Sequence, residues 1–189
     1  MLNASAGANT HKGALYSMGI LCCAAGMAGE KAELDVLLRH AAEIAAPSLE
    51  RMKNMAAECA VTGGERQYFA SGYTGARGEA AMGFPTVKHI SLPAFKRALS
   101  EGKSLNDAGL YALCALISSV CDSNILRRAG EDTLRDARNM AKAALDNGTD
   151  KEMLREMNDI FVRKNISPGG SADLLALTYF LYDWETREK

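Results

Sequence analysis

Residues 105–120 read LNDAGLYALCALISSV and carry a sustained helical pattern. Apolar side chains recur there at helical spacing, with alanines between them that permit close packing. These apolar residues are Leu105, Leu110, Leu113, Leu116, Ile117 and Val120. Ser104 and Asp107 supply the polar start of a helix. We therefore expect residues 105–120 to form the central helix of the core.

The same periodicity dominates on both sides of this segment, and strand signals are almost absent. Residues 33–60 are expected to form two helices broken at Ala46-Pro47, because proline suits a first helical turn and disfavours the α region before it. Short polar junctions separate the helical runs. The pattern predicts an all-α fold, a single domain over residues 1–189 built as one compact array of seven or eight helices.

Composition limits the kinds of partner that the protein is expected to bind. The chain has 189 residues, 48% of them hydrophobic, and a formal net charge of -1, so no global positive field would hold nucleic acid or an anionic membrane. The longest apolar stretch, residues 14–28, is interrupted by Gly19 and Gly26 and falls short of the roughly 20 residues that cross a bilayer. It is expected to be a buried core helix. Met1 leads directly into small polar residues without a basic leader, which predicts a cytoplasmic protein.

The cysteines favour neither a disulfide scaffold nor a zinc site. Their number is odd, and they form no Cys-x-x-Cys pair. Most lie in apolar helical runs, so we expect small, reduced core residues and no nucleophile. The five are Cys22, Cys23, Cys59, Cys114 and Cys121.

Four junctions combine glycine with residues that bind phosphate, metal or protons, and we number these clusters one to four along the chain. Cluster one is GANTHKG, residues 7–13, directly before the apolar run. The amides of a helix start attract an anion, and Lys12 adds a positive charge, so a phosphate would fit. The alternative is that Asn9 or Thr10 caps the helix while His11 and Lys12 are exposed. The spacing is not that of a Walker A loop.

Cluster two is GYTGARGE, residues 72–79, followed by Gly83-Phe84-Pro85. An arginine between glycines can approach a phosphate without crowding, and Glu79 can serve as a base or metal ligand. The alternative is a mobile surface turn in which Arg77 and Glu79 form an ion pair. The density of glycine favours the functional interpretation.

Cluster three is CDSN, residues 121–124, which ends the most apolar segment and is followed by Arg127-Arg128-Ala129-Gly130. Asp122 and Asn124 offer oxygen ligands of the kind that hydrated Mg²⁺ prefers. The alternative roles of Asp122 are helix capping or a salt bridge to Arg127 or Arg128.

Cluster four is NISPGGSAD, residues 165–173. Ser171 can cap the last helix, and Asp173 is expected in its first turn, where a carboxylate complements the helix dipole. Gly169 and Gly170 would let the backbone approach a ligand closely, and the amides there form an anion nest.

Together, the four clusters resemble the triphosphoribosyl-dephospho-CoA synthase family, and the resemblance covers essentially the whole chain. The matching stretches are Asn9-Thr10-His11-Lys12-Gly13, Gly75-Ala76-Arg77-Gly78-Glu79-Ala80 with Gly83-Phe84-Pro85, Asp122-Ser123-Asn124 with Arg128, and Ser167-Pro168-Gly169-Gly170-Ser171-Ala172-Asp173-Leu174-Leu175-Ala176. The family pattern has threonine where this chain has Ser123 and glycine where it has Ala129. Family members also carry an upstream helical portion with a Lys-Pro-Gly stretch. The chain is therefore expected to be the C-terminal part of the family fold, and apolar surface left uncovered could drive formation of a homodimer.

The resemblance implies a glycosyl transfer between ATP and 3′-dephospho-CoA. The ribose 2′-hydroxyl of dephospho-CoA attacks the anomeric carbon of ATP, adenine leaves, and the triphosphate stays on the transferred ribose. The product is the prosthetic-group precursor for the acyl carrier protein of citrate lyase or malonate decarboxylase, and a further transferase would load it. Such a reaction needs a carboxylate base, a donor for the leaving base and cations on the triphosphate.

The resemblance and the chemistry together suggest a role for each residue. Lys12, Arg77 and Arg128 are expected on phosphates, Glu79 or Asp173 as the base, and His11 as donor to adenine. Asp122 and Asn124 are expected to hold Mg²⁺ or orient the ribose, and Asp122 also counts among the catalytic candidates. The remaining candidates for nucleotide binding are Asn9, Thr10, Gly13, Gly78, Gly169, Gly170 and Ser171.

Two other functions use the same residues. A helical Mg²⁺-dependent hydrolase of nucleotides or ADP-ribose-like glycosides would place water where the CoA hydroxyl attacks. A truncated, non-catalytic chain would keep the helical core and nucleotide binding alone.

Overall fold

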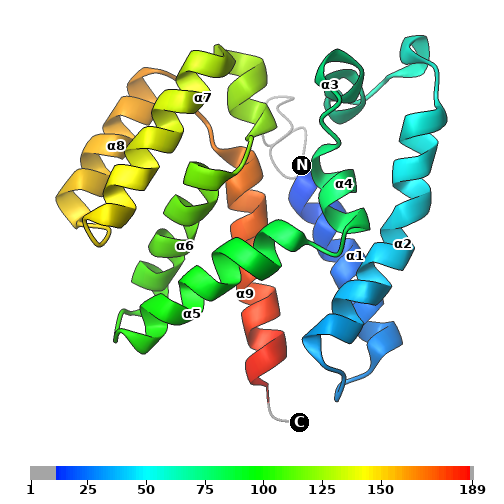
Figure 1. Ribbon diagram of the computed structural model, residues 1–189, viewed down its shortest axis with the longest axis horizontal. Helices are drawn as coiled ribbons and strands as arrows, with labels where there is room; N and C mark the ends of the chain where they lie inside the picture. Colours follow the sequence, from blue (N-terminus) through cyan, green and yellow to red (C-terminus); the bar gives the residue numbers. More distant parts are fainter. Residues whose placement is uncertain (1–11, 188–189) are drawn as a thin grey trace, which may run out of the picture. The chain divides into compact units, whose positions relative to one another are not determined.

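The computed structural model describes residues 12–187, less the side chains of Ser123, Arg127 and Arg128 (Figure 1). Every regular element in that range is a helix, which confirms the all-α prediction. Nine α-helices occur there, against the seven or eight expected. The chain divides into two compact units that meet in sequence at Phe84 and Pro85. The single domain over residues 1–189 stays a prediction.

The first unit contains four α-helices and a short 3-10 turn. They are α1 (Lys12–Ala28), α2 (Leu34–Asn54), η1 (Ala57–Cys59), α3 (Gly63–Ser71) and α4 (Gly75–Ala81). Helix α2 packs against both α1 and α4, and α4 also contacts α1 and α3. The two helices that bear clusters one and two, α1 and α4, are therefore held by a common partner.

Helix α2 runs through Pro47, so the predicted break at Ala46-Pro47 is wrong. Proline removes one backbone hydrogen bond and crowds the preceding turn, at a cost of about 3 kcal/mol in a helix interior. Pro47 itself is exposed, so its ring lies on the solvent side of the helix. Buried residues on both sides of it, such as Ala45 and Met52, keep the helix on the core. Packing on both sides of the proline offsets its local cost.

Helix α1 forms as predicted but buries only one face. Ile20, Leu21 and Ala24 are buried, whereas Leu15 and Met27 remain 63% and 59% exposed. A fully apolar helix was expected to be covered on all sides. Within the described part of the chain, no helix has the length and apolar character that crossing a bilayer requires.

Most of the cysteines are also less buried than predicted. All five are free thiols, and only Cys114 is fully buried. Burial raises the pKa of the Cys114 thiol to about 11, which suits an inert core residue. Cys22, Cys23 and Cys59 are exposed. The apolar neighbours of Cys22 and Cys23 were a poor guide, because an apolar run along a helix does not show which of its faces is buried.

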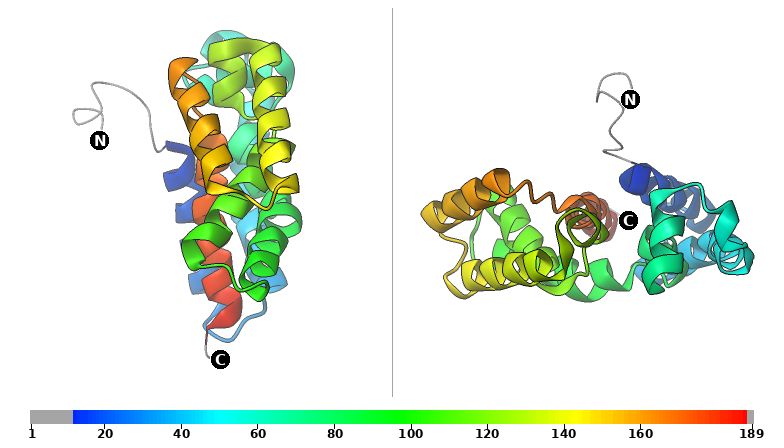
Figure 2. Two further views of the ribbon diagram at one scale, coloured as in Figure 1. Left: turned by 90° about the vertical axis from the view of Figure 1, so that its left-hand side faces the viewer. Right: turned by 90° about the horizontal axis from the view of Figure 1, so that it is seen from above.

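The second unit contains five α-helices and a π-helical turn. They are η2 (Val87–Ser91), α5 (Leu92–Ser100), α6 (Leu105–Ser119), α7 (Ser123–Asp146), α8 (Lys151–Arg163) and α9 (Gly169–Thr186). Helix α6 contacts η2, α5, α7 and α9, which confirms it as the central helix of this unit. Helices α7 and α8 lie side by side (Figure 2).

Small residues let α9 approach α6 closely. A Cβ atom added at Gly109 would lie 1.9 Å from Tyr179 Oη, so only glycine leaves room for the phenol ring. The rings of Tyr179 and Tyr182 pack edge-on against Phe95, with centroids 4.9 and 5.1 Å apart. A buried hydroxyl pair, Ser91 Oγ and Thr178 Oγ1 at 2.6 Å, joins α9 to η2. These contacts fix α9, whose first turn belongs to cluster four.

Candidate functional site

The four clusters divide equally between the two units. Clusters one and two belong to the first unit, and clusters three and four to the second.

Cluster one lies largely outside the described residues, which include neither Asn9, Thr10 nor His11. Lys12 and Gly13 belong to the first turn of α1, and Lys12 is exposed. Because α1 packs against α4, this turn belongs to a helix that contacts the one bearing cluster two. The roles of cluster one stay predictions.

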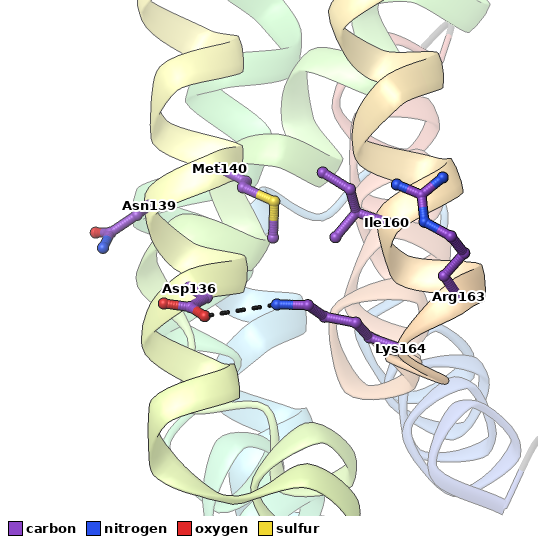
Figure 3. A pocket seen from close by; sticks show the side chains of 6 residues that line it. All are labelled: Asp136, Asn139, Met140, Ile160, Arg163 and Lys164. Atoms are coloured by element: carbon purple, nitrogen blue, oxygen red, sulfur yellow. Dashed lines mark ion pairs between the residues drawn. The ribbon is translucent and has the colours of Figure 1, made fainter.

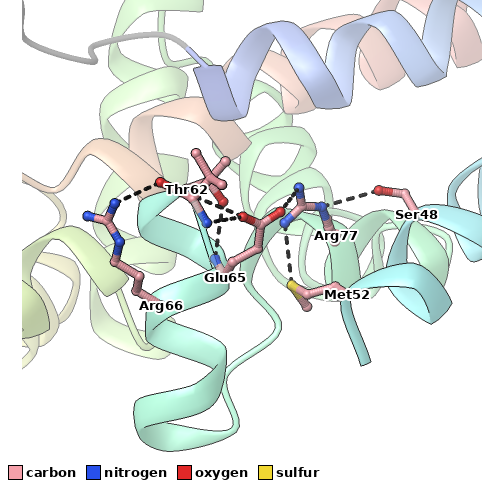
Figure 4. A network of polar contacts seen from close by, with 7 residues as sticks. Ser48, Met52, Thr62, Glu65, Arg66 and Arg77 are labelled. Carbon is pink, nitrogen blue, oxygen red and sulfur yellow. Dashed lines mark hydrogen bonds and ion pairs between the residues drawn. The ribbon is translucent and has the colours of Figure 1, made fainter. Parts of the chain in front are cut away.

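Arg77 of cluster two is held by three side chains of the first unit (Figure 4). Its Nη2 lies 3.0 Å from Glu65 Oε1 in an ion pair, and its Nε donates to Ser48 Oγ at 3.2 Å. Its Nη1 lies 3.4 Å from the sulfur of Met52. A guanidinium has five N–H donors, so these contacts engage three of them. Arg77 thus ties α4 to α2 and α3, and a phosphate would have to share it with Glu65.

The partner Glu65 was not predicted from the sequence, where only Glu79 was considered as an ion-pair partner of Arg77. Glu65 Oε2 accepts hydrogen bonds from the backbone of Thr62 at 2.8 Å and of Val61 at 3.1 Å. Thr62 Oγ1 accepts in return from Glu65 N, which completes a capping box at the start of α3. The Thr-x-x-Glu spacing of this capping box is visible in the sequence and could have revealed the capping role of Glu65.

This environment lowers the pKa of the Glu65 carboxyl to about 2. The backbone hydrogen bond from Thr62 is the largest cause, and the charge of Arg77 is a smaller one. Burial opposes these effects but does not overcome them. Glu65 therefore stays ionised at neutral pH and serves as a structural anion.

The glycine of cluster two has a packing role. A Cβ atom added at Gly78 would lie 1.8 Å from Oγ1 of Thr74, the residue directly before α4. Glu79 follows it on α4 and is half-buried. The predicted base thus lies on a short helix beside a buried glycine, and its catalytic role stays a prediction.

Clusters three and four meet at Asp122, which is 2% exposed. Asp122 caps α7, because its Oδ1 accepts from Asn124 N at 2.9 Å and from Ile125 N at 3.4 Å. Its Oδ2 accepts from the backbone N–H of Ser171 at 2.9 Å and from the Ser171 hydroxyl at 3.2 Å. One carboxylate therefore joins the first turns of α7 and α9, and the capping alternative is confirmed.

Ser171 does not cap α9, contrary to the prediction. The helix begins at Gly169, with Pro168 in the capping position and no side-chain cap. Ser171 is fully buried in the first turn and donates to Asp122. Since the helix starts three residues earlier than expected, Asp173 lies beyond its first turn, where it is half-buried. The acceptor that Asp122 provides from outside explains why α9 can begin without a cap of its own.

Gly169 and Gly170 allow a close approach, as predicted, but to α7. A Cβ atom at Gly170 would lie 3.2 Å from Asp122 Oδ2, and one at Gly169 would lie 2.9 Å from Asn124 Nδ2. Both contacts are tighter than ordinary van der Waals distances. The two glycines leave the space that Asp122 and Asn124 occupy.

The start of α7 is a separate short segment. The helix extends to Asp146, but it is kinked at Gly130, which has φ 82° and ψ 177°, a conformation that only glycine adopts without strain. Arg128 lies just before this kink, and its side chain is outside the described residues. Its phosphate role stays a prediction.

Asp122 does not fit the predicted magnesium site. A carboxylate has about four lone-pair positions, and four N–H or O–H donors already surround this one. Those hydrogens carry partial positive charge and would repel a cation. No group of three or more His, Cys, Asp or Glu side chains suited to a metal occurs among residues 12–187. Magnesium binding by the protein stays a prediction.

A shallow recess of about 360 Å³ lies between α7 and α8 and is lined by residues that belong to none of the four clusters (Figure 3). Its lining is mixed, with an ion pair of Lys164 and Asp136 at 3.9 Å on one side. The lining residues are Asp136, Asn139, Met140, Ile160, Arg163 and Lys164. None of them was a candidate from the sequence.

Comparison with known proteins gives one consistent result. The profile of a family described as "ATP:dephospho-CoA triphosphoribosyl transferase" matches residues 1–189. The 2-(5''-triphosphoribosyl)-3'-dephosphocoenzyme-A synthase of Pectobacterium atrosepticum is 39% identical over 188 residues, which cover 98% of this chain and 62% of the relative. A protein of Lactiplantibacillus plantarum named "Probable 2-(5''-triphosphoribosyl)-3'-dephosphocoenzyme-A synthase" is 36% identical over 189 residues, which cover 96% of this chain and 66% of the relative. The chain thus spans about three fifths of the length of such relatives. No solved structure matches it.

Proposed function

The chain belongs to the ATP:dephospho-CoA triphosphoribosyl transferase family, and we propose that it carries the triphosphoribosyl transfer of that family. The observation that supports this most is the match over residues 1–189, which includes all four clusters. The meeting of clusters three and four at Asp122 adds to it, because residues 49 positions apart in sequence are brought together.

The proposed reaction is a substitution at the anomeric carbon of ATP. The ribose 2′-oxygen of 3′-dephospho-CoA forms a bond to C1′, and the bond from C1′ to adenine N9 breaks. The 2′-hydroxyl proton goes to a base, and adenine leaves with a proton, so the charges balance. The triphosphate remains on the transferred ribose. Positive charge develops on that ribose in the transition state and calls for nearby negative groups.

Two carboxylates are proposed for proton transfer. Glu79 and Asp173 are each half-buried, on α4 and α9 respectively. Asp122 is set aside as a base because its carboxylate is filled by hydrogen-bond donors. Lys12 and Arg128 are proposed to bind phosphate, and Arg77 to contribute while it keeps Glu65.

Other parts of the proposal follow from the substrates. Mg²⁺ enters as the counter-ion of the triphosphate, bound mainly by phosphate oxygens and water. His11 is proposed to donate to the departing adenine. The product would serve the acyl carrier protein of citrate lyase or malonate decarboxylase through a second transferase. A cytoplasmic location and a homodimer belong to the same proposal.

The test is release of adenine by the purified protein, measured by liquid chromatography. With Mg-ATP and 3′-dephospho-CoA, adenine is expected, and none when dephospho-CoA is omitted. Release of adenine or phosphate without dephospho-CoA would instead establish a hydrolase. Binding of Mg-ATP by calorimetry with no turnover under either condition would favour a chain that binds nucleotide without catalysis.

Glu79→Gln and Asp173→Asn separate the two candidate bases. The variant that loses the base is expected to release adenine at least about 100-fold more slowly, the usual contribution of general base catalysis. Asp136→Asn, an exposed carboxylate on α7, is the matched control and should keep the wild-type rate. Wild-type rates in both Glu79→Gln and Asp173→Asn would refute the assignment of the base.

A further inference from the structure

We propose that Asp122 is a positioning residue, which fixes the first turn of α7 against the first turn of α9 and thereby sets the geometry of the proposed active site. This deepens the proposed function and rests on it. It replaces the metal-binding and catalytic roles that the sequence suggested for Asp122.

The four hydrogen bonds of Asp122 divide evenly between the two helices. Oδ1 accepts hydrogen bonds from two backbone amides of α7, and Oδ2 accepts from the amide and the hydroxyl of Ser171 in α9. Each helix start presents N–H groups without intrahelical acceptors and a partial positive charge. A single negative charge satisfies both. Without it, two positive helix ends would face each other in a buried position.

The neighbouring residues are adapted to this carboxylate. At Gly170 a Cβ atom would press on Asp122 Oδ2 and Cγ at 3.2 and 3.4 Å, so any larger residue would make the carboxylate shift by a few tenths of an ångström. Gly169 makes the same allowance for the Asn124 amide at 2.9 Å. The glycines of cluster four and the polar residues of cluster three thus form one joint.

The joint connects the segments that carry proposed substrate-binding residues. The first turns of α7 contain Asn124 and Arg128, and α9 carries Asp173 one turn after Gly169. A shift of about 1 Å between binding groups can slow a reaction about 100-fold. A buried residue that touches no substrate can therefore control the rate.

The first arm of the test measures the joint without any substrate. In Asp122→Asn one oxygen becomes an NH₂ group, so one helix start loses its acceptor. Amide hydrogen exchange of residues 169–173 and 123–126, followed by mass spectrometry, is expected to be at least about tenfold faster in the variant. Ser171→Ala removes only the hydroxyl donor and should give a smaller increase. Wild-type exchange in Asp122→Asn would overturn the joint, whatever the protein's activity.

The second arm asks what the joint does, by adenine release. Gly170→Ala keeps the carboxylate of Asp122 but pushes it away from α9. If Asp122 is a positioning residue, this variant should lower kcat/KM at least about tenfold, and Asp122→Asn should do the same. The kcat/KM of the double variant, Asp122→Asn with Gly170→Ala, should be no lower than that of the slower single variant. The Mg²⁺ concentration at half-maximal rate should stay within twofold of wild type in Asp122→Asn.

The matched control is Ser91→Ala, which removes another buried hydrogen bond of α9, to Thr178. It is expected to lower stability similarly yet keep the wild-type kcat/KM. A loss of rate in Asp122→Asn with wild-type kcat/KM in Gly170→Ala would overturn positioning and make the carboxylate itself the acting group. A Mg²⁺ requirement raised more than tenfold in Asp122→Asn would do the same. If wild-type protein releases no adenine, the proposed function fails, while the exchange arm still decides the joint.

Discussion

Replacing Glu65 by glutamine should remove a defined part of the pH dependence of folding. In the folded protein the carboxyl has a pKa of about 2, against an ordinary value of 4.5 in the unfolded chain. A folded pKa below the unfolded one stabilises the protein above pH 4.5, and that stabilisation is lost as the pH falls from 4.5 towards 2. The difference corresponds to about 3 kcal/mol at neutral pH, of which about 2 kcal/mol is lost by pH 3.

The measurement is urea unfolding between pH 7 and pH 3, followed by circular dichroism. Trp184, the only tryptophan of the chain, lies in the second unit, so its fluorescence reports on its surroundings there. The unfolding free energies of wild type and Glu65→Gln should differ most at pH 7 and converge on acidification. Glu50→Gln, an exposed carboxylate on α2, is the control and should run parallel to wild type. Parallel curves for Glu65→Gln and wild type over the whole range would refute the role assigned to this network.

Three further perturbations test the packing. Gly109→Ala should lower the unfolding free energy by about 1–3 kcal/mol, because the new methyl group displaces the Tyr179 hydroxyl, whereas Gly26→Ala on open helix surface should raise it by up to about 1 kcal/mol. Pro47→Ala should raise the melting temperature by restoring a helix hydrogen bond on an exposed face; a lower melting temperature would mean that the proline itself is packed. In native protein a thiol reagent should label the exposed cysteines and leave Cys114 unmodified until denaturant is added, and rapid native labelling of Cys114 would contradict its burial.

The sequence predicted what local patterns control. The apolar spacing of residues 105–120 identified the central helix of the second unit, and Ser104 does accept from Asp107 N at its start. The break at Pro47 was wrong because local preference was outweighed by burial on both sides of the proline. A single-residue preference of a few kcal/mol cannot show whether distant partners offset it.

The site was predictable as a set of residues but not as a set of contacts. Asp122, Gly170 and Ser171 were all selected from composition and spacing, yet nothing local shows that one carboxylate caps two helices 49 positions apart. The pairing of Arg77 with Glu65 was likewise not foreseen, because Glu65 comes from a different helix. Asp122 and Arg77 were both predicted to bind a ligand or metal, and in the structure both side chains hold helices together.

A chain with the proposed activity moves an intact triphosphoribosyl group from ATP to 3′-dephospho-CoA. The most direct measurement uses ATP labelled in the γ-phosphate, with the products separated and counted by chromatography and mass spectrometry. We expect one adenine released for each labelled CoA derivative formed, with all three phosphates retained. Label recovered as free phosphate, or adenine formed without a labelled CoA derivative, would contradict the claim.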